Sequence, residues 1–177
     1  MQIKGAEQNV LLLDSVSKRY SMCGARIGCI VSKNKEVMDA VMRLAQSRLC
    51  SPLVEQVAAE AAIDTPEEYF AAVKEEYIHR RDVMIELLNN IPGVYTPKPM
   101  GAFYTIARLP VEDAEDFAKW MLEEFSYKEQ TTMVAPAAGF YATPGRGKDE
   151  VRLAYVLNVE DIKNAIGISD KDYNNIV

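Results

Sequence analysis

The chain has 177 residues, of which 49% are hydrophobic and 26% charged, and its formal net charge is −6. This composition excludes wholesale disorder, because enough apolar side chains are present to form a core. The acidic balance argues against nucleic acid or an acidic membrane surface as a partner. No run approaches the roughly 20 apolar residues of a membrane-spanning helix, and no signal-peptide pattern opens the chain.

The first half predicts two strands followed by three helices. Short apolar runs bounded by polar residues predict strands over 10–14 and 27–32, of the kind that is buried on both faces. Apolar residues at helical spacing predict helices over 35–48 and 53–63. A third, longer helix is expected to end near Asn89, before a proline and a glycine.

The second half alternates short apolar runs with two further helix patterns. Strands are expected over 94–96, 103–107, 132–135 and 151–157. Asp113 and Asn158 are expected to cap helices, and Gly167 to end the second of them. This order predicts a sheet with helices on one face, an α/β sandwich.

The three cysteines, Cys23, Cys29 and Cys50, are an odd number without metal-like spacing. This usage predicts no metal site and favours a reducing, cytoplasmic environment.

The turn between the first two strands holds the most informative side chains. Lys18 follows the end of a strand, where a lysine can lose its charge and act as an amine nucleophile toward an aldehyde. Eight residues later, Arg26 can grip a phosphate with its planar fork, helped by the hydroxyl of Ser15. Taken singly, each of these residues is most often a solvated surface group. Their joint spacing favours the functional interpretation.

Residues 15–28 read Ser-Val-Ser-Lys-Arg-Tyr-Ser-Met-Cys-Gly-Ala-Arg-Ile-Gly. This segment resembles the cofactor-lysine segment of the fold-type I aminotransferases that use pyridoxal phosphate, approximately Ser-x-Ser-Lys-x-(Phe/Tyr)-x-x-x-Gly-x-Arg-x-Gly, and matches every specified position. Residues 150–155, Glu-Val-Arg-Leu-Ala-Tyr, resemble the strand whose arginine binds the substrate α-carboxylate. Residues 99–104 are similar to a strand of the small domain. Within this family the similarity is greatest to the aspartate aminotransferase group.

The resemblance implies a role for each matching residue. Lys18 would form an aldimine with pyridoxal 5'-phosphate and later move a proton at the substrate Cα. Ser15 and Arg26 would hold the cofactor phosphate, and Arg152 would bind the substrate α-carboxylate. The implied substrates are an amino acid, in the nearest group aspartate, and a 2-oxo acid, and the implied assembly is a homodimer.

The chain departs from the family pattern upstream of Lys18, where only 17 residues stand in place of most of the large domain. The resemblance therefore implies the C-terminal part of an aminotransferase, inactive by itself. Residues 1–50 would be the remainder of the large cofactor-binding domain, 51–90 connecting helices and 91–177 the small α/β sandwich domain. Strands without their neighbours expose hydrogen-bonding edges, so residues 1–50 are expected to be covered by self-association or partly rearranged.

Two alternatives stay open. One is a carbon–sulfur β-lyase that uses the same cofactor, lysine and carboxylate-binding arginine. The other is a non-enzymatic fragment that dimerises through the exposed strands.

Overall fold

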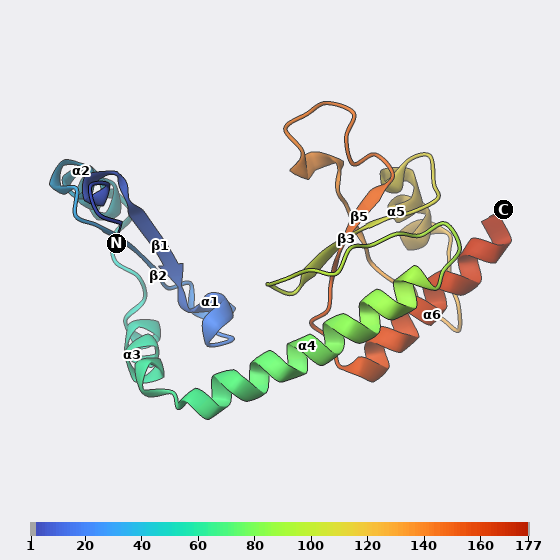
Figure 1. Ribbon diagram of the computed structural model, residues 1–177, viewed down its shortest axis with the longest axis horizontal. Helices are drawn as coiled ribbons and strands as arrows, with labels where there is room; N and C mark the ends of the chain where they lie inside the picture. The colour runs from blue at the N-terminus through green and yellow to red at the C-terminus, as the bar shows by residue number, and fades with distance from the viewer. Residues whose placement is uncertain (1–2, 177) are drawn as a thin grey trace. The chain divides into compact units, whose positions relative to one another are not determined.

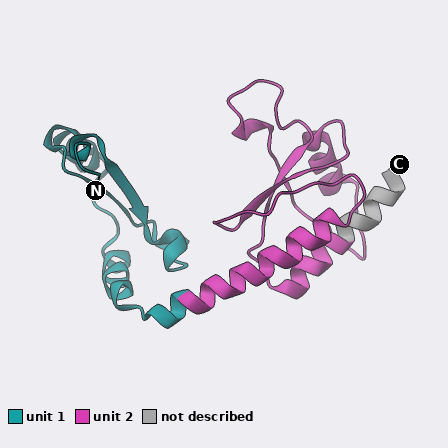
Figure 2. Cartoon of the chain, in the orientation of Figure 1, with its two compact units in different colours: residues 1–70 teal, residues 71–177 magenta. Residues whose placement is uncertain are grey.

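The computed structural model describes the backbone of residues 3–176 and the side chains of residues 3–167. The chain divides into two compact units, Met1–Phe70 and Ala71–Val177, shown in teal and magenta in Figure 2. Each unit combines helices with an antiparallel sheet, and the α/β class expected from the sequence is confirmed. No helix of the described part is both long and apolar enough to cross a membrane.

The first unit is built on a two-stranded sheet, in which β1 (Leu11–Ser15) pairs antiparallel with β2 (Gly28–Ser32) (Figure 1). Leu13 lies opposite Ile30 in this register. The helices and 3-10 turns around it are η1 (Glu7–Asn9), α1 (Val16–Arg19), η2 (Cys23–Ala25), α2 (Lys35–Arg48), α3 (Leu53–Ala61) and η3 (Ala62–Asp64). These positions agree with the strands and the first two helices predicted from the sequence.

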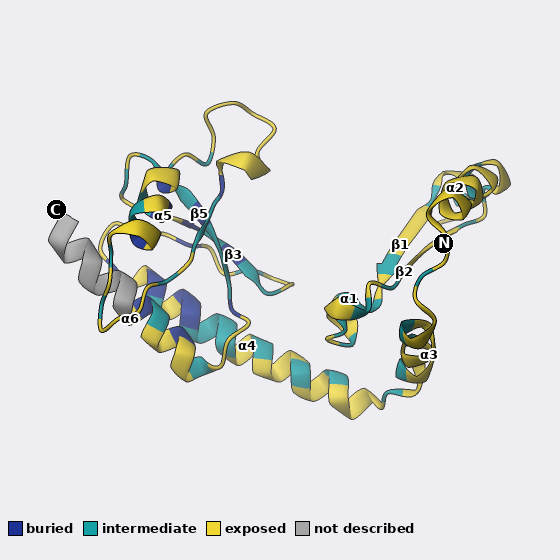
Figure 3. Ribbon diagram, turned by 180° about the vertical axis from the view of Figure 1, so that it is seen from behind, coloured by how far each residue is buried: buried dark blue, intermediate teal, exposed yellow. Residues whose placement is uncertain are grey.

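The prediction that the two strands are buried on both faces is wrong for this chain. None of residues 3–70 is buried, and both strands are coloured mainly as exposed in Figure 3. The side chain of Leu13 is 70% exposed and that of Ile30 is 38% exposed. The cause is that a sheet of two strands has no third strand to continue it, so both outer edges and much of both faces stay open.

The second unit holds a three-stranded antiparallel sheet in the order β3 (Tyr104–Arg108), β5 (Glu150–Ala154) and β4 (Ala135–Pro136). The long helix α4 (Glu67–Asn89) begins in the first unit and contributes its buried residues to the second. The remaining helices of the unit are α5 (Ala114–Glu123), η4 (Ala138–Phe140) and α6 (Val159–Ile176).

The core of the second unit lies between one face of the sheet and helices α4 and α6. One buried cluster of this core joins apolar residues of the two helices, the isoleucine that follows α4 and the tyrosine that follows β5: Met84, Leu88, Ile91, Tyr155, Ile162 and Ile166. Asp113 caps α5 as predicted, its carboxylate accepting from the Glu115 backbone N–H at 2.9 Å. Asn158 likewise accepts from the Asp161 backbone N–H at 2.9 Å, at the start of α6.

Four expectations for this unit are wrong. The strand expected over 151–157 stops early, since β5 ends at Ala154. The expected strand over 94–96 is a single bridge between Tyr95 and Arg108. Of the expected strand over 132–135, only Ala135 pairs, because β4 is displaced toward the following proline. Gly167 does not end α6, since it lacks the positive φ of a glycine that terminates a helix.

Successive side chains of β5 point to opposite faces of the sheet. Val151 is 1% exposed and contributes to the core, whereas its neighbour Arg152 is half-buried on the opposite face. The same alternation places Tyr104 of β3 on the face of Arg152, because Tyr104 pairs with Ala154 and Ile106 pairs with Arg152.

Candidate cofactor and carboxylate sites

The lysine turn begins where β1 ends, at a serine that caps the next helix. The Ser15 hydroxyl accepts from the Ser17 backbone N–H at 3.0 Å and donates to the Ser17 hydroxyl at 2.7 Å. Serine is a favoured N-cap residue because its oxygen satisfies an N–H that the helix leaves unpaired. This cap turns the chain sharply out of the strand and places Lys18, which is exposed, in the single turn of α1.

Lys18 lines a shallow, open hollow. The other lining residues are Leu13, Asp14, Ser15 and Arg19. The only carboxylate among them, that of Asp14, is ion-paired with Arg19 at 2.8 Å. With two cationic side chains against one carboxylate, the hollow has a net positive charge and suits an anionic ligand.

Arg26 lines a different hollow on the same unit. Its Nη1 donates to the Cys23 carbonyl oxygen at 3.0 Å, and its backbone is left-handed, with φ of 54°. The lining of this second hollow comes from β1, β2 and α2, and it shares Leu13 and Asp14 with the hollow of Lys18. The structure therefore brings Ser15 and Lys18 together in one hollow and places Arg26 in the adjacent one.

Gly28 is required by the close packing of β2 against β1. A Cβ at this position would lie 2.9 Å from the carbonyl oxygen of Asp14, its partner across the strands being Ser15. Only glycine therefore permits this close approach of β2 to β1.

Arg152 lies in the second unit, on the sheet face away from the helices. The Cζ atom of its guanidinium lies 4.7 Å from the ring centroid of Tyr104 and 4.6 Å from that of Phe140. Among the described side chains it forms no ion pair and donates no hydrogen bond. Its N–H groups, which match a carboxylate in geometry, are thus left uncommitted by the described side chains.

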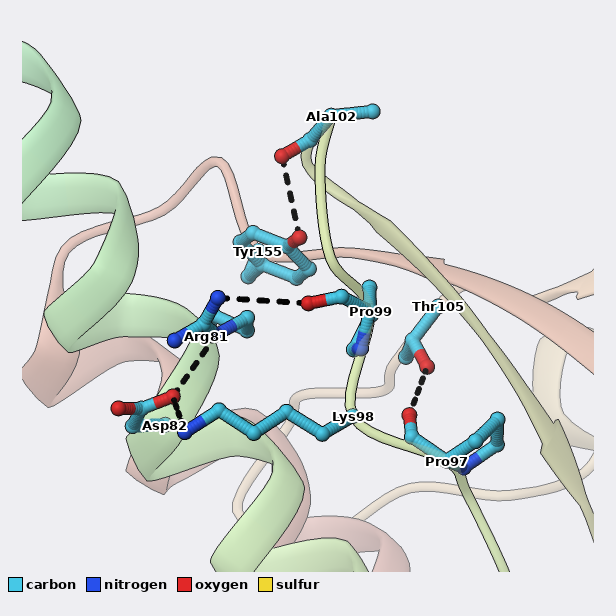
Figure 4. A network of polar contacts seen from close by, with 8 residues as sticks. All are labelled: Arg81, Asp82, Pro97, Lys98, Pro99, Ala102, Thr105 and Tyr155. Carbon is cyan, nitrogen blue, oxygen red and sulfur yellow. Dashed lines mark hydrogen bonds and ion pairs between the residues drawn. The ribbon is translucent and has the colours of Figure 1, made fainter.

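A polar network holds the segment that precedes β3 against α4 (Figure 4). Asp82 is ion-paired with Arg81 at 2.8 Å and with Lys98 at 2.9 Å, and Arg81 donates to the Pro99 carbonyl oxygen at 3.3 Å. The hydrogen bond from Arg81, with that from Lys98, lowers the pKa of the Asp82 carboxyl to about 2. The sequence carries no signal for this network, because charged residues on a helix normally form a solvated face.

A family model described as aminotransferase class I and II matches residues 3–167. This chain belongs to that family. The match spans both units and includes all four candidate residues, Ser15, Lys18, Arg26 and Arg152, so the resemblance stated from the sequence is confirmed at the level of the family.

Individual aminotransferases agree with this assignment. The chain is 29% identical over 174 residues to an aspartate aminotransferase of Pyrococcus horikoshii, covering 96% of this chain and 42% of that protein. It is 32% identical over 172 residues to a glutamate-pyruvate aminotransferase of Escherichia coli, covering 94% and 39%. Among solved structures, an alanine aminotransferase from Pyrococcus furiosus superposes with a TM-score of 0.78 at 28% identity, covering 94% of this chain and 42% of that one. The chain thus spans about two fifths of the length of the aminotransferases it matches.

The donor set of the lysine turn fits a phosphorylated aldehyde in its chemistry. Lys18 offers an amine that can react with an aldehyde, and the hydroxyls of Ser15 and Ser17 can bind a phosphate beside it. Arg26 offers a guanidinium of the right chemistry, but it lines the neighbouring hollow rather than that of Lys18. Ser17 is a specified position of the lysine segment to which no role was assigned, and its hydroxyl accepts a hydrogen bond from that of Ser15. The sequence carries no periodic signal for Phe140, the last residue of the short 3-10 helix η4, as a neighbour of Arg152.

Proposed function

We propose that this chain carries the cofactor-lysine segment and the small domain of a pyridoxal 5'-phosphate-dependent aminotransferase. The observation that carries the proposal is the position of Lys18, one turn after a serine-capped strand end, within a family match over residues 3–167. The substrates would be an amino acid, aspartate being the first candidate, and a 2-oxo acid. The cofactor, when bound, supplies the electron sink that makes the substrate Cα–H bond acidic.

The residues of this chain would divide the work as follows. Lys18 would hold the cofactor aldehyde through its amine and move a proton at the substrate Cα as general base and then acid. Ser15 would donate a hydrogen bond from its hydroxyl to the phosphate, and Arg26 would bind the phosphate with its guanidinium. Arg152 would bind the α-carboxylate through two parallel N–H groups and so orient the Cα–H bond.

We also propose a domain assignment, which the family match supports. Residues 1–50 would belong to the large domain, 51–90 to connecting helices and 91–177 to the small domain. We further propose a homodimer in the cytoplasm. The family resemblance supports the dimer, and the three cysteines, which are all free thiols, support a reducing compartment.

A chemical trap on the chain itself tests the lysine assignment. Pyridoxal phosphate is added, the adduct is reduced with borohydride, and peptide mass spectrometry locates the modified lysine. The expected result is a modification concentrated on Lys18 and lost in Lys18→Ala. Lys33→Ala is the matched control, because Lys33 is an exposed lysine that follows the other strand of the same unit. Modification of Lys33 and other exposed lysines to the same extent as Lys18 would contradict the assignment.

A second candidate function is favoured by the exposed faces of β1 and β2, namely a fragment that dimerises without catalysis. An amino-transfer assay separates the two, performed with and without a supplied N-terminal portion of an aminotransferase. Transfer that appears only when that portion is present supports the enzyme. A thiol product in place of a new amino acid would instead identify the carbon–sulfur β-lyase.

A further inference from the structure

Arg152 is restrained by two aromatic rings and by no polar partner among the described side chains. Its Cζ atom lies within 5 Å of the centroids of both rings, those of Tyr104 and Phe140. A cation over an aromatic face is attracted by the ring quadrupole, yet this contact uses none of the directional N–H groups. The guanidinium is therefore held in place while its hydrogen-bonding capacity remains available.

Ring contact alone does not produce this arrangement, as a second arginine in the same unit shows. Arg80 lies over the ring of Tyr77 at 5.4 Å. Its Nε also donates to the Glu76 carboxylate at 2.7 Å, and its Nη1 donates to the Val156 carbonyl oxygen at 2.7 Å. Arg80 is thus a structural arginine with committed donors, whereas the contacts of Arg152 within residues 3–167 are those with the two rings.

The sheet fixes the first of the two rings. Tyr104 on β3 and Arg152 on β5 are diagonal neighbours on one face, since Tyr104 pairs with Ala154 and Arg152 with Ile106. Diagonal neighbours of an antiparallel pair lie about 7–8 Å apart, which is within reach of long and aromatic side chains. The position of the Tyr104 ring is therefore set by strand register.

The second ring is fixed by an anchored loop. Before Phe140, the buried Ala137 donates its backbone N–H to the Glu150 carbonyl oxygen at 2.8 Å, and the Phe140 N–H returns to the Ala137 carbonyl oxygen at 2.9 Å. After Phe140, the Tyr141 hydroxyl donates to the carboxylate of the same Glu150. Both sides of Phe140 are thus tied to one residue of β5, two positions from Arg152.

We propose that Phe140 and Tyr104 are positioning residues that hold the Arg152 guanidinium ready for an incoming carboxylate. The inference rests on the proposed function and deepens it, because it names what orients the carboxylate-binding group before substrate arrives. An unrestrained arginine loses side-chain freedom when it binds, and a restrained one has lost that freedom already. Phe140 and Tyr104 would accordingly act on affinity without touching the reacting atoms.

The restraint is tested first without any ligand. In protein labelled with ¹⁵N and ¹³C on arginine, Arg152→Lys assigns the Arg152 side-chain signal, and exchange of its Nη groups reports guanidinium rotation. Phe140→Leu is expected to speed this rotation to that of exposed arginines, and Phe140→Tyr to restore the slow rate. Tyr95→Leu is the matched control, because Tyr95 and Phe140 are both 56% exposed. Equally slow rotation in Phe140→Leu and in the wild-type chain would overturn the proposal.

Carboxylate binding is tested second, with pyruvate as the probe and sodium chloride at equal ionic strength as the blank. Phe140→Leu should bind pyruvate about two- to fivefold more weakly, the loss expected for one exposed cation–aromatic contact. Phe140→Tyr should bind as the wild type does. Unchanged affinity in Phe140→Leu overturns the positioning role alone. No response of Arg152 to pyruvate in the wild-type chain overturns the carboxylate assignment as well.

Discussion

The hydroxyl of Tyr155 donates a hydrogen bond to the carbonyl oxygen of Ala102 at 3.1 Å (Figure 4). Tyr155 is 1% exposed in the core of the second unit, and its burial raises the pKa of the phenol, so it stays a neutral donor. Ala102 is held with a φ of 58°, in a region that costs a residue with a Cβ about 1–2 kcal/mol. The core tyrosine thus secures a strained residue just before β3.

Tyr155→Phe should lower the free energy of unfolding by about 1 kcal/mol, the usual net contribution of one hydrogen bond. The ring keeps its packing in this variant, so the loss isolates the contact with Ala102. Urea unfolding followed by circular dichroism measures it. Tyr95→Phe serves as the control, since the Tyr95 side chain is largely exposed. Equal stability of Tyr155→Phe and Tyr95→Phe would show that the hydroxyl contributes nothing.

The Arg81–Asp82–Lys98 network should make stability depend on pH in the acid range. The pKa of Asp82 is lowered from 3.8 to about 2, so its contribution is complete above about pH 5 and is lost progressively as the pH falls through 2 toward about 1. Asp82 is 43% exposed, and solvent screening limits the contribution to on the order of 0.5 kcal/mol. Asp82→Asn should therefore be less stable than the wild type at pH 6, and this difference should be much smaller near pH 2 and vanish near about pH 1.

Thermal unfolding of both proteins across that range provides the measurement. Glu86→Gln, on the same helix but outside the network, should leave the pH profile unchanged. A gap between Asp82→Asn and wild type that persists undiminished at pH 2 would mean that the charge of Asp82 is not what stabilises the segment.

Gly147 and Gly145 offer a matched pair in the loop that carries Phe140. Both have a positive φ, 73° at Gly147 and 79° at Gly145. A Cβ on Gly147 would lie 2.5 Å from the Tyr141 ring, whereas a Cβ on Gly145 would have no neighbour within 4 Å among the described residues. Both alanine variants should have a free energy of unfolding lowered by about 1–2 kcal/mol, because alanine is disfavoured in the left-handed region. The free energy of unfolding of Gly147→Ala should be lower by about 1 kcal/mol more, because of the clash with the Tyr141 ring.

The pKa of Tyr141 supplies an independent readout of the same pair. Its hydrogen bond to the Glu150 carboxylate raises this pKa above the ordinary value for tyrosine. Gly147→Ala should displace the ring and move the pKa back toward that value, and Gly145→Ala should not. Tyrosinate absorbance measures both, and identical titrations of the two variants would argue against the predicted displacement.

The exposed strands of the first unit should drive self-association of the isolated chain. Leu13→Lys places a charge on β1 and should shift the sedimentation profile toward monomer, because a charge on an exposed apolar strand opposes pairing. Leu44→Lys on α2 is the control, with a similar exposed fraction of 68% against 70%. Full protection of residues 1–50 from limited proteolysis in a demonstrated monomer would contradict this expectation.

Local patterns predicted the elements well where the deciding interactions are local. The cap at Asp113 and the helix over 35–48 depend on residues within one or two turns, and both are present. Burial of the strand over 10–14 depends on neighbouring strands, so an apolar run could indicate a strand without fixing what covers it. The end of α6 was misplaced because a glycine tolerates helical φ as readily as it terminates a helix.

The candidate site divides in the same way. Spacing alone brought out Ser15 and Lys18, which one capped turn holds together. The environment of Arg152 could not be predicted, because it depends on strand register with Tyr104 and on a loop that folds back to Glu150. Contacts made through register and loop anchoring leave no periodic trace in the sequence.

The two faces of β5 also limit how this strand can change. Val151 fills the core and Arg152 meets the two rings, and a slip of one residue would exchange them. A single-residue insertion or deletion in the strand would thus drive a guanidinium into the hydrocarbon interior and leave valine facing outward. The burial of Val151 in the apolar core therefore fixes the register of β5 and with it the face on which Arg152 lies. The strand can vary by substitution but not in length.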